Sequence, residues 1–362
     1  MNTRKYNNKN NSETIFMLMF LIIFAACFIP FLVKSATGKN DDKQTAKEQP
    51  LDTTVTTENA EPSQLEEPGI TFKYDESEIL SLSDIQSETA VLYDVSSNTI
   101  LFSKNKDKIT FPASTTKIMT AYVALKYLPE DYMITVGPEI TLIQPDSSVA
   151  YLSQGNVISF KDALYALMLP SGNDAAYTIA VNTARYVSDA PSMEDAEAVK
   201  YFCNLMNETA TEIGAKNTHF CNPDGYHDLY HYTTAEDLLR IALKSREIPL
   251  IAEISSAKYH HINIESGEEF FWSNGNSLIV NDSGYYLPFA NGLKTGFTDE
   301  AGYCMVATAE YKGKDLIAVV MKAPSISARY TDAANLLYSE TEPEKIKIIE
   351  ETTITEQTTL SQ

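Results

Sequence analysis

Apolar residues recur with a helical period in the middle of segment 111–128, and this is the most distinctive element that the pattern predicts. Pro112 favours the start of a helix and Pro129 ends it. Ser114 and Lys117 lie three residues apart near this start and would share one helical face. A hydroxyl beside an amine on a buried helix is a candidate nucleophile with its own base.

The spacing Ser-x-x-Lys occurs elsewhere in the chain, so spacing alone does not select the nucleophile. Ser103 and Lys106 lie in a polar run that is typical of a solvated turn. Ser255 and Lys258 lie in a segment without a strong helical apolar stripe. Only Ser114 opens a long apolar helix, and this context favours it.

Strand patterns flank a largely helical middle segment. Residues 90–105 alternate around a Ser-Ser-Asn turn and predict a β-hairpin. Strand and turn patterns follow at 137–159, helices at 161–169, 174–186, 192–214 and 233–245, strands at 259–264, 292–298 and 303–323, and a closing helix at 327–338. Caps are expected at Ser192 and Asp195 and in the capping box 233–236. We therefore predict an α+β fold, with an antiparallel sheet flanked by helices and an inserted helical cluster.

Residues 15–33 are almost continuously apolar and long enough to span a bilayer. Basic residues precede this segment, which predicts a cytoplasmic N-terminus at 1–14 and a single-pass protein of the cell membrane, with its catalytic domain on the extracytoplasmic side. A retained anchor is favoured over a cleaved signal, which would give a secreted protein, because the apolar run is unusually long for a signal. A lipoprotein site at Cys27 is a weaker alternative, since the run continues past it.

Composition separates the regions that follow. Residues 34–75 are polar and acidic and predict a disordered stalk, residues 76–340 contain the folded domain, and residues 341–362 predict a disordered tail. The net charge of -21 is spread over the folded part and argues against a nucleic-acid partner. Three cysteines outside the apolar span are widely spaced and do not form a disulfide framework: Cys203, Cys221 and Cys304.

Three short motifs follow one another along the chain: Ser114-Thr115-Thr116-Lys117, Ser171-Gly172-Asn173 and Lys294-Thr295-Gly296. Acyl transfer by a serine requires a base, a proton donor for the leaving group, and N–H groups for the oxyanion. Lys117 can be the base only when its amine is neutral, which burial and a second cation such as Lys294 would favour. The loop at Ser171 can present a hydroxyl and an amide to the same cleft.

With these motifs the chain resembles a serine-type D-alanyl-D-alanine carboxypeptidase of the low-molecular-mass penicillin-binding protein family. The resemblance covers roughly residues 83–338 and includes PSGNDAA (170–176), FCNPDGYHDLYHYTTAEDL (220–238) and NGLKTGFTDEAGYCMVATA (291–309). It implies a β-lactamase/transpeptidase-like fold. It also implies removal of the terminal D-alanine from peptidoglycan stem pentapeptides through an acyl-enzyme, with β-lactam antibiotics as covalent inhibitors.

The resemblance implies a role for each motif residue. Ser114 would attack the carbonyl of the penultimate D-alanine, and Lys117 would accept its proton. Ser171 would help to relay the proton to the leaving D-alanine, and Asn173 would position the substrate. The substrate-binding strand would comprise Lys294 and Thr295, which hold the terminal carboxylate, together with Gly296 and Phe297. The backbone N–H groups of Ser114 and Phe297 would form the oxyanion hole, and no metal or cofactor is implied.

The chain departs from the family pattern at its ends. Family members commonly carry a second, all-β domain and a C-terminal amphipathic anchor, whereas here the last predicted helix leads into a short polar tail. The N-terminal apolar segment would replace that anchor. This difference bears on how far the catalytic domain lies from the membrane and on which partners it contacts, and not on the chemistry.

Three other functions deserve comparison. A class A β-lactamase resembles a pattern with Ser-Asp-Asn and a Glu-x-x-Leu-Asn loop, but here the second motif is Ser-Gly-Asn and that loop is absent between Asn173 and Lys294. A metallohydrolase is suggested by His227 and His231, yet Gly225 and the following capping box predict a loop there instead of the helix that a zinc site needs. A catalytically silent wall-binding protein would not need the lysine base. Endopeptidase activity, and a role in growth or in sporulation, stay open.

If Ser114 is the nucleophile, labelled penicillin will acylate the chain at this residue. Ser114→Ala should abolish the labelling seen on a gel, whereas Ser103→Ala and Ser255→Ala should retain it. Labelling that survives Ser114→Ala would contradict the assignment.

Overall fold

Residues 70–75 and 80–347 are described by a computed structural model. The predicted membrane span at 15–33 and most of the predicted stalk at 34–75 lie outside these residues, as does the end of the predicted tail. Within the described ranges, no helix has the length and apolar character needed to cross a membrane. The predictions for the N-terminal segment therefore stay predictions.

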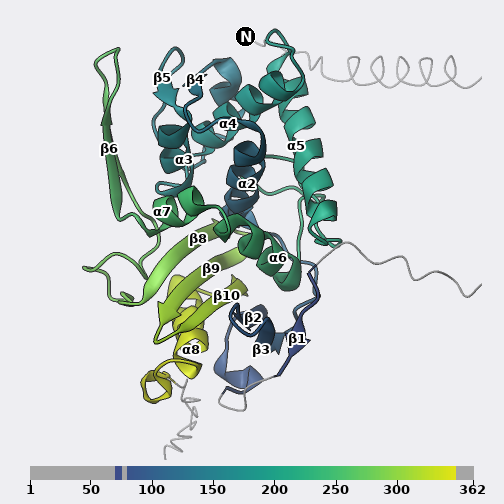
Figure 1. The fold of residues 1–362 in the computed structure, drawn as a ribbon, viewed down its shortest axis with the longest axis vertical. Helices are drawn as coiled ribbons and strands as arrows, with labels where there is room; N and C mark the ends of the chain where they lie inside the picture. Colours follow the sequence, from purple (N-terminus) through teal and green to yellow (C-terminus); the bar gives the residue numbers. More distant parts are fainter. Residues whose placement is uncertain (1–69, 76–79, 348–362) are drawn as a thin grey trace, which may run out of the picture. The chain divides into compact units, whose positions relative to one another are not determined.

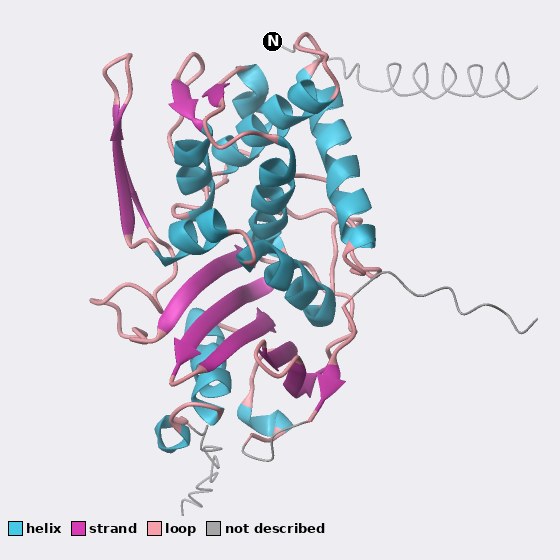
Figure 2. Ribbon diagram, in the orientation of Figure 1, coloured by secondary structure: helices cyan, strands magenta, loops and turns pink. Residues whose placement is uncertain are grey.

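A six-stranded sheet takes its strands from both ends of the described chain (Figures 1 and 2). Its order is β1 (Lys73–Tyr74), β3 (Thr99–Lys104), β2 (Thr89–Asp94), β10 (Lys314–Ala323), β9 (Gly302–Tyr311) and β8 (Ala290–Thr298). Val91 of β2 lies opposite Val319 of β10, so an early and a late strand pair at the centre. Every pairing is antiparallel except β1 with β3, which is parallel. The predicted sheet topology is confirmed, with β1 as a short parallel addition.

Both faces of the sheet are buried, because successive strand residues point to opposite sides. Val91 and Val319 belong to the core that the sheet shares with the helical cluster. Their sequence neighbours Leu92 and Ala318 point to the other face and pack with helix α8 (Ile326–Ser339). Burial on two faces explains why these strands are rich in apolar residues.

A cluster of helices separates β3 from β8 in the sequence and packs above the sheet in Figure 1. It comprises α2 (Lys117–Tyr127), α3 (Phe160–Met168), α4 (Asn173–Val187), α5 (Asp195–Glu212), α6 (Ala235–Arg246) and α7 (Pro249–Ser256). Helix α2 contacts α3, α4, α5 and α6 and is therefore buried on most sides. Ile118, Met119 and Val123 are all fully buried. The inserted helical cluster that the sequence predicted is confirmed.

Two short antiparallel pairs lie outside the main sheet. One joins β4 (Met133–Thr135) to β5 (Val157–Ser159), and the residues between them include a 3-10 turn at Pro138–Leu142. The other is the hairpin of β6 (Tyr259–Asn263) and β7 (Glu269–Ser273), which projects beside α3 and α7 in Figure 1. The pattern predicted the first strand of this hairpin but not its partner.

Several predicted helix boundaries are wrong. The helix expected within segment 111–128 begins only at Lys117, after a 3-10 turn at Ala113–Thr116 whose first residue, Ala113, has a positive φ of 48°. Helix α5 has no side-chain cap, since Glu194 instead of Ser192 stands at its N-cap. At α6 the cap is Thr234, whose hydroxyl accepts from the Asp237 N–H, one residue later than expected.

Helix α7 was not predicted. Its apolar positions Leu250, Ile251 and Ile254 are buried, but the helix has only 8 residues, too few to establish a period. The described ends of the predicted stalk and tail also pack on the domain. Residues of β1 pair with β3, and Asn335 hydrogen-bonds the backbone of Lys347 through both atoms of its amide.

Candidate active site

Ser114 lies in the 3-10 turn that precedes α2, and the neighbouring backbone holds this turn in place. The Thr115 hydroxyl donates to the Pro112 carbonyl at 2.6 Å. Ala113, with its positive φ, redirects the chain just before the nucleophile. A left-handed conformation is costly for a residue with a side chain, and such strain is frequent at functional sites.

Lys117 connects three separate segments of the chain. Its side-chain nitrogen donates to Ser114 Oγ at 3.0 Å, to Asn173 Oδ1 at 2.7 Å and to the Asp224 carbonyl oxygen at 2.8 Å. The residue is fully buried. The predicted contact between nucleophile and base is therefore present, and Asn173 joins it from the start of α4.

Burial lowers the pKa of Lys117 to about 8, because desolvation disfavours the ammonium form. The carboxylates of Asp224 and Asp174 act in the opposite direction and moderate the shift. A lysine with this pKa is neutral in a substantial fraction of molecules near neutral pH, as a proton acceptor must be.

The loop before α4 places Ser171 beside the same cluster. Ser171 has a positive φ of 64°, and its buried hydroxyl has no hydrogen-bond partner in the part of the chain that the structure describes. Asp174 anchors the start of α4, because its carboxylate accepts hydrogen bonds from the N–H groups of Ala150 at 2.8 Å and Leu152 at 2.9 Å. A hydroxyl held in this way is free to bond a ligand.

Lys294 lies on β8 and is only 3% exposed. Its side-chain nitrogen donates to the Thr295 carbonyl at 2.9 Å. Burial lowers its pKa well below the usual range, and the positive charges of Lys117 and Arg329 add to that effect. Strand β8 thus brings a second lysine close enough to interact with Lys117, as expected.

Gly296 allows β8 to lie directly against the nucleophile turn. A Cβ atom at this position would be 2.9 Å from the backbone nitrogen of Ser114 and 3.0 Å from that of Thr115. Phe297, the next residue, is 47% exposed and stacks on Tyr303 with ring centroids 4.4 Å apart. The close approach brings the Phe297 and Ser114 backbones to one side of the same pocket.

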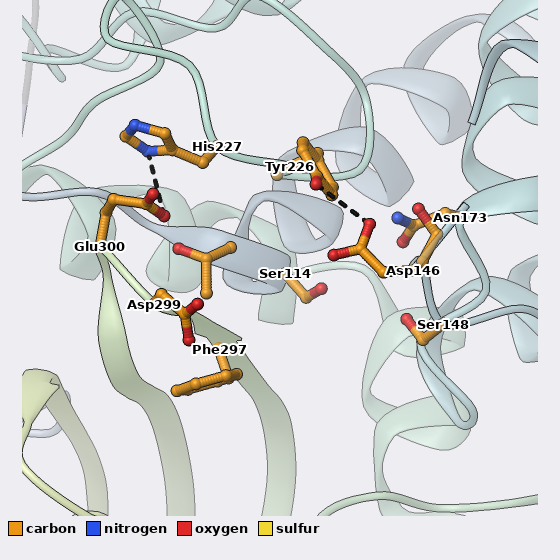
Figure 3. Close-up of a pocket in the computed structure, with 12 residues that line it drawn as sticks. Ser114, Asp146, Ser148, Asn173, Tyr226, His227, Phe297, Asp299 and Glu300 are labelled. Atoms are coloured by element: carbon orange, nitrogen blue, oxygen red, sulfur yellow. Dashed lines mark hydrogen bonds and ion pairs between the residues drawn. The ribbon is translucent and has the colours of Figure 1, made fainter. Parts of the chain in front are cut away.

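These elements enclose a pocket of about 310 Å³ that contains Ser114. Figure 3 shows the serine at its centre, with Phe297, Asp299 and Glu300 toward one side and Asp146, Ser148 and Asn173 toward the other. Thr295 is half-buried on the adjoining strand. All eight predicted site residues thus come from these three segments of the chain, and Gly296 allows β8 to pack closely against the nucleophile turn.

The other serine-lysine pairs have different surroundings. Lys106 forms ion pairs with Asp107 at 2.9 Å and Glu236 at 2.5 Å. Ser255 lies at the end of α7 and donates to the Ala252 carbonyl, whereas Lys258 donates to Asn281. Of the three pairs, the one at Ser114 has a lysine that donates to its own serine and to a second motif.

Sequence reasoning missed Arg329 and Asp224. Arg329, on α8, donates to the Gly296 carbonyl at 3.3 Å, and its guanidinium lies over the ring of Tyr330. The same helix also carries the buried polar residues Asp332 and Asn335, so no residue pattern distinguished Arg329. Asp224 contributes its backbone carbonyl to Lys117, and no side-chain pattern could have indicated this contact.

The histidines of the near-zinc pattern lie in a loop, as predicted. His231 is buried, with Nε2 2.8 Å from the Thr116 hydroxyl, and its Nδ1 accepts from the Cys221 N–H at 3.0 Å. Burial lowers its pKa to about 3, so the ring is neutral and holds the 221–225 loop against the nucleophile turn. Within the described ranges, no cluster of metal-ligating side chains is present.

The family model that describes D-alanyl-D-alanine carboxypeptidases matches residues 76–325. This chain belongs to that family.

Individual relatives agree with the family match. A D-alanyl-D-alanine carboxypeptidase of Streptomyces sp. (strain K15) is 34% identical over 248 residues, which are 66% of this chain and 81% of the relative. The carboxypeptidase DacF of Bacillus subtilis is 28% identical over 256 residues, 70% of this chain but only 61% of the relative. The crystal structure of the Streptomyces K15 DD-transpeptidase aligns with a TM-score of 0.65 at 32% identity and covers 72% of this chain and 98% of that chain.

These comparisons confirm four predictions made from the sequence: the family, the α+β penicillin-binding fold, the serine-type carboxypeptidase function and the enzyme class. Hydrolase activity on the cell wall follows from the same assignment.

We expect Gly225 to be essential for the nucleophile turn. Gly225 has a φ of +84°, and a Cβ atom would lie 1.9 Å from the Ala113 carbonyl oxygen. Gly225→Ala should therefore lower the free energy of unfolding by about 2–4 kcal/mol, measured with urea, and abolish penicillin labelling.

Gly155→Ala is the matched control. Gly155 also has a positive φ, +96°, but no atom lies within 4 Å of its added Cβ. Gly155→Ala should lower the free energy of unfolding by only about 1–2 kcal/mol, because of backbone strain, and the variant should still be labelled by penicillin. Equal effects of the two substitutions would refute the role of the close contact.

Proposed function

We propose that this chain removes the terminal D-alanine from peptidoglycan stem pentapeptides through an acyl-enzyme on Ser114. The observation that carries the proposal is the buried Lys117 amine, hydrogen-bonded to both Ser114 Oγ and Asn173 Oδ1 beside an open pocket. A general base in contact with the hydroxyl that it activates is the minimum requirement for this chemistry.

In the acylation step, Ser114 Oγ attacks the carbonyl carbon of the penultimate D-alanine. Its proton passes to neutral Lys117, and the bond to the terminal D-alanine nitrogen then breaks. The unpartnered Ser171 hydroxyl is suited to relay a proton to the leaving amine. Water attacks the resulting ester, which releases the shortened peptide and restores Ser114.

The substrate carboxylate would bind beside Lys294 and Thr295. Arg329 supports this end of the cleft, because it holds the Gly296 carbonyl and adds positive charge near Lys294. The backbone N–H groups of Ser114 and Phe297 would receive the oxyanion. The close packing at Gly296 supports this assignment.

A membrane-anchored protein with an extracytoplasmic catalytic domain is the arrangement that we propose for the whole chain. The apolar segment 15–33 and the basic residues that precede it support this topology. The acidic segment that follows would act as a tether between the membrane and the domain. β-Lactam antibiotics would acylate Ser114, as the penicillin-binding family implies.

Purified chain incubated with a pentapeptide that ends in D-Ala-D-Ala should release D-alanine. Ser114→Ala should reduce the release to background, and a peptide ending in L-Ala-L-Ala serves as the substrate control. A binding protein without activity would release none. If the chain hydrolysed penicillin rapidly instead of retaining it as a covalent adduct, the β-lactamase alternative would be favoured.

The pKa of Lys117 predicts the pH dependence of acylation. Below about pH 8 the ammonium form predominates and cannot accept the serine proton, so the rate constant of acylation should rise with pH and level off above this value. Lys117→Arg should lower the rate by about 10²–10⁴-fold, because a guanidinium stays protonated. Stopped-flow measurements with a fluorescent penicillin would report both effects, and a pH-independent wild-type rate would contradict the role of Lys117.

A further inference from the structure

Asp224 is a buried acidic residue that lies against the base of the active site. Its backbone carbonyl accepts a hydrogen bond from Lys117 Nζ at 2.8 Å, and the residue is only 1% exposed. Of its two carboxylate oxygens, Oδ1 accepts from the Tyr226 N–H at 3.1 Å. Oδ2 is buried and, within residues 70–75 and 80–347, has no partner in hydrogen-bond geometry, although Asn173 lies close to the carboxylate. A carboxylate in such a place is costly unless a positive charge compensates it.

Lys117 provides the compensating charge. Burial raises the pKa of the Asp224 carboxyl, and attraction to Lys117 is the largest effect that acts against this rise. In return, burial lowers the pKa of Lys117 to about 8, and the Asp224 carboxylate is the strongest of the charges that oppose this fall. The two side chains act on each other through space, because the Lys117 amine already bonds Ser114 Oγ, Asn173 Oδ1 and the Asp224 carbonyl oxygen.

The other titratable groups around Lys117 are better compensated or neutral. Asp174, on α4, also favours the ammonium form, but its carboxylate already accepts hydrogen bonds from three backbone N–H groups. Lys294, on β8, repels the ammonium, and burial lowers its own pKa well below the usual range. His231 is neutral, because burial lowers its pKa to about 3. Of the two acids that act on Lys117, Asp224 therefore carries the less compensated charge.

Two further titratable groups face Asp224 itself, Tyr177 on α4 and Cys203 on α5. Burial raises the pKa of both side chains, to about 12 for the cysteine, so each is neutral near neutral pH. Lys117 is thus the cation to which the Asp224 charge responds.

The number of protons on Lys117 determines when this charge matters. A neutral amine has two N–H groups and one lone pair, whereas an ammonium has three N–H groups. In the neutral form the two N–H groups bond Asn173 and the Asp224 carbonyl, which leaves the lone pair for the Ser114 hydroxyl. As Ser114 Oγ bonds to the carbonyl carbon of the substrate, its proton moves onto this lone pair. A full positive charge then appears beside the Asp224 carboxylate.

We propose that Asp224 is a positioning residue whose carboxylate acts through Lys117: it stabilises the ammonium formed when Lys117 takes the Ser114 proton, and thereby sets the pH range of acylation. The proposal rests on the proposed acyl-enzyme function and adds a residue to it. Without the carboxylate, Lys117 would lose its proton at a lower pH but would also be a weaker base. Removal of this charge should therefore speed acylation in acid and slow it at the plateau, two opposite effects that general damage to the site does not produce.

Asp224→Asn removes the charge but keeps an oxygen for the Tyr226 N–H. The rate constant of acylation by a fluorescent penicillin is measured by stopped flow as a function of pH. The midpoint of the profile should fall by about one pH unit, the size expected for the loss of a nearby opposite charge. At about pH 6 the variant should react about 3-fold faster than the wild type, whereas its plateau should be about 3-fold lower.

Asp228→Asn is the matched control. Asp228 lies in the same connection between α5 and α6, and its carboxylate accepts a backbone N–H from two residues later at 2.7 Å, as that of Asp224 does at 3.1 Å. Its charge acts on Cys221 and His231 and is not among those that shift the pKa of Lys117. This variant should keep the midpoint and the plateau of the wild type.

Asp224→Ser removes the same charge with a smaller side chain, and its midpoint should fall as well. The rate constant describes the reactive molecules, so it does not depend on the fraction that is folded. Midpoints that stay at the wild-type pH in both Asp224 variants would overturn the inference, as would an equal fall in Asp228→Asn. If the midpoints fall as expected but the wild type releases no D-alanine from a pentapeptide ending in D-Ala-D-Ala, the inference stands and the proposed reaction is wrong.

Discussion

The buried Lys117 amine is the interaction on which the active site depends. It joins the nucleophile turn, the first residue of α4 and the 221–225 loop through three hydrogen bonds. A buried ammonium without partners would be very costly, so the surrounding acceptors and the lowered pKa are linked consequences of its position. The same burial that stabilises the packing of α2 makes this amine a usable base.

Close contacts between backbone segments fix the geometry of the site around this lysine. Gly296 brings β8 against the nucleophile turn, and Gly225 brings the 221–225 loop against Ala113. Positive φ values at Ala113 and Ser171 occur where the chain turns into the segments that carry Ser114 and Asn173. His231, kept neutral by burial, supports the loop from behind through Thr116.

Charged side chains are distributed unevenly around the cleft. Cationic side chains are buried behind β8, where a carboxylate would meet them, and carboxylates lie around the open pocket. Strand β8 links the two regions, because it carries Lys294 and leads into the turn at Asp299. Family membership supports the reaction class, and the positions of these charges follow from the packing of β8.

The fold class, the order of the elements and the three motifs could be predicted from the amino-acid sequence, because strand alternation, helical period and short motifs are local signals. It also separated Ser114 from the other serine-lysine pairs, since only that serine precedes a long apolar helix. The starts of α2 at Lys117 and of α5 at Asp195 were predicted wrongly, because backbone conformation there follows from tertiary packing. The three-dimensional arrangement was needed to find the contacts of Arg329 and of the Asp224 carbonyl. It was also needed to find the three carboxylates that line one pocket. These contacts join segments that are distant in the sequence. Every residue has a backbone carbonyl, so the residue type gives no indication of a contact made through it.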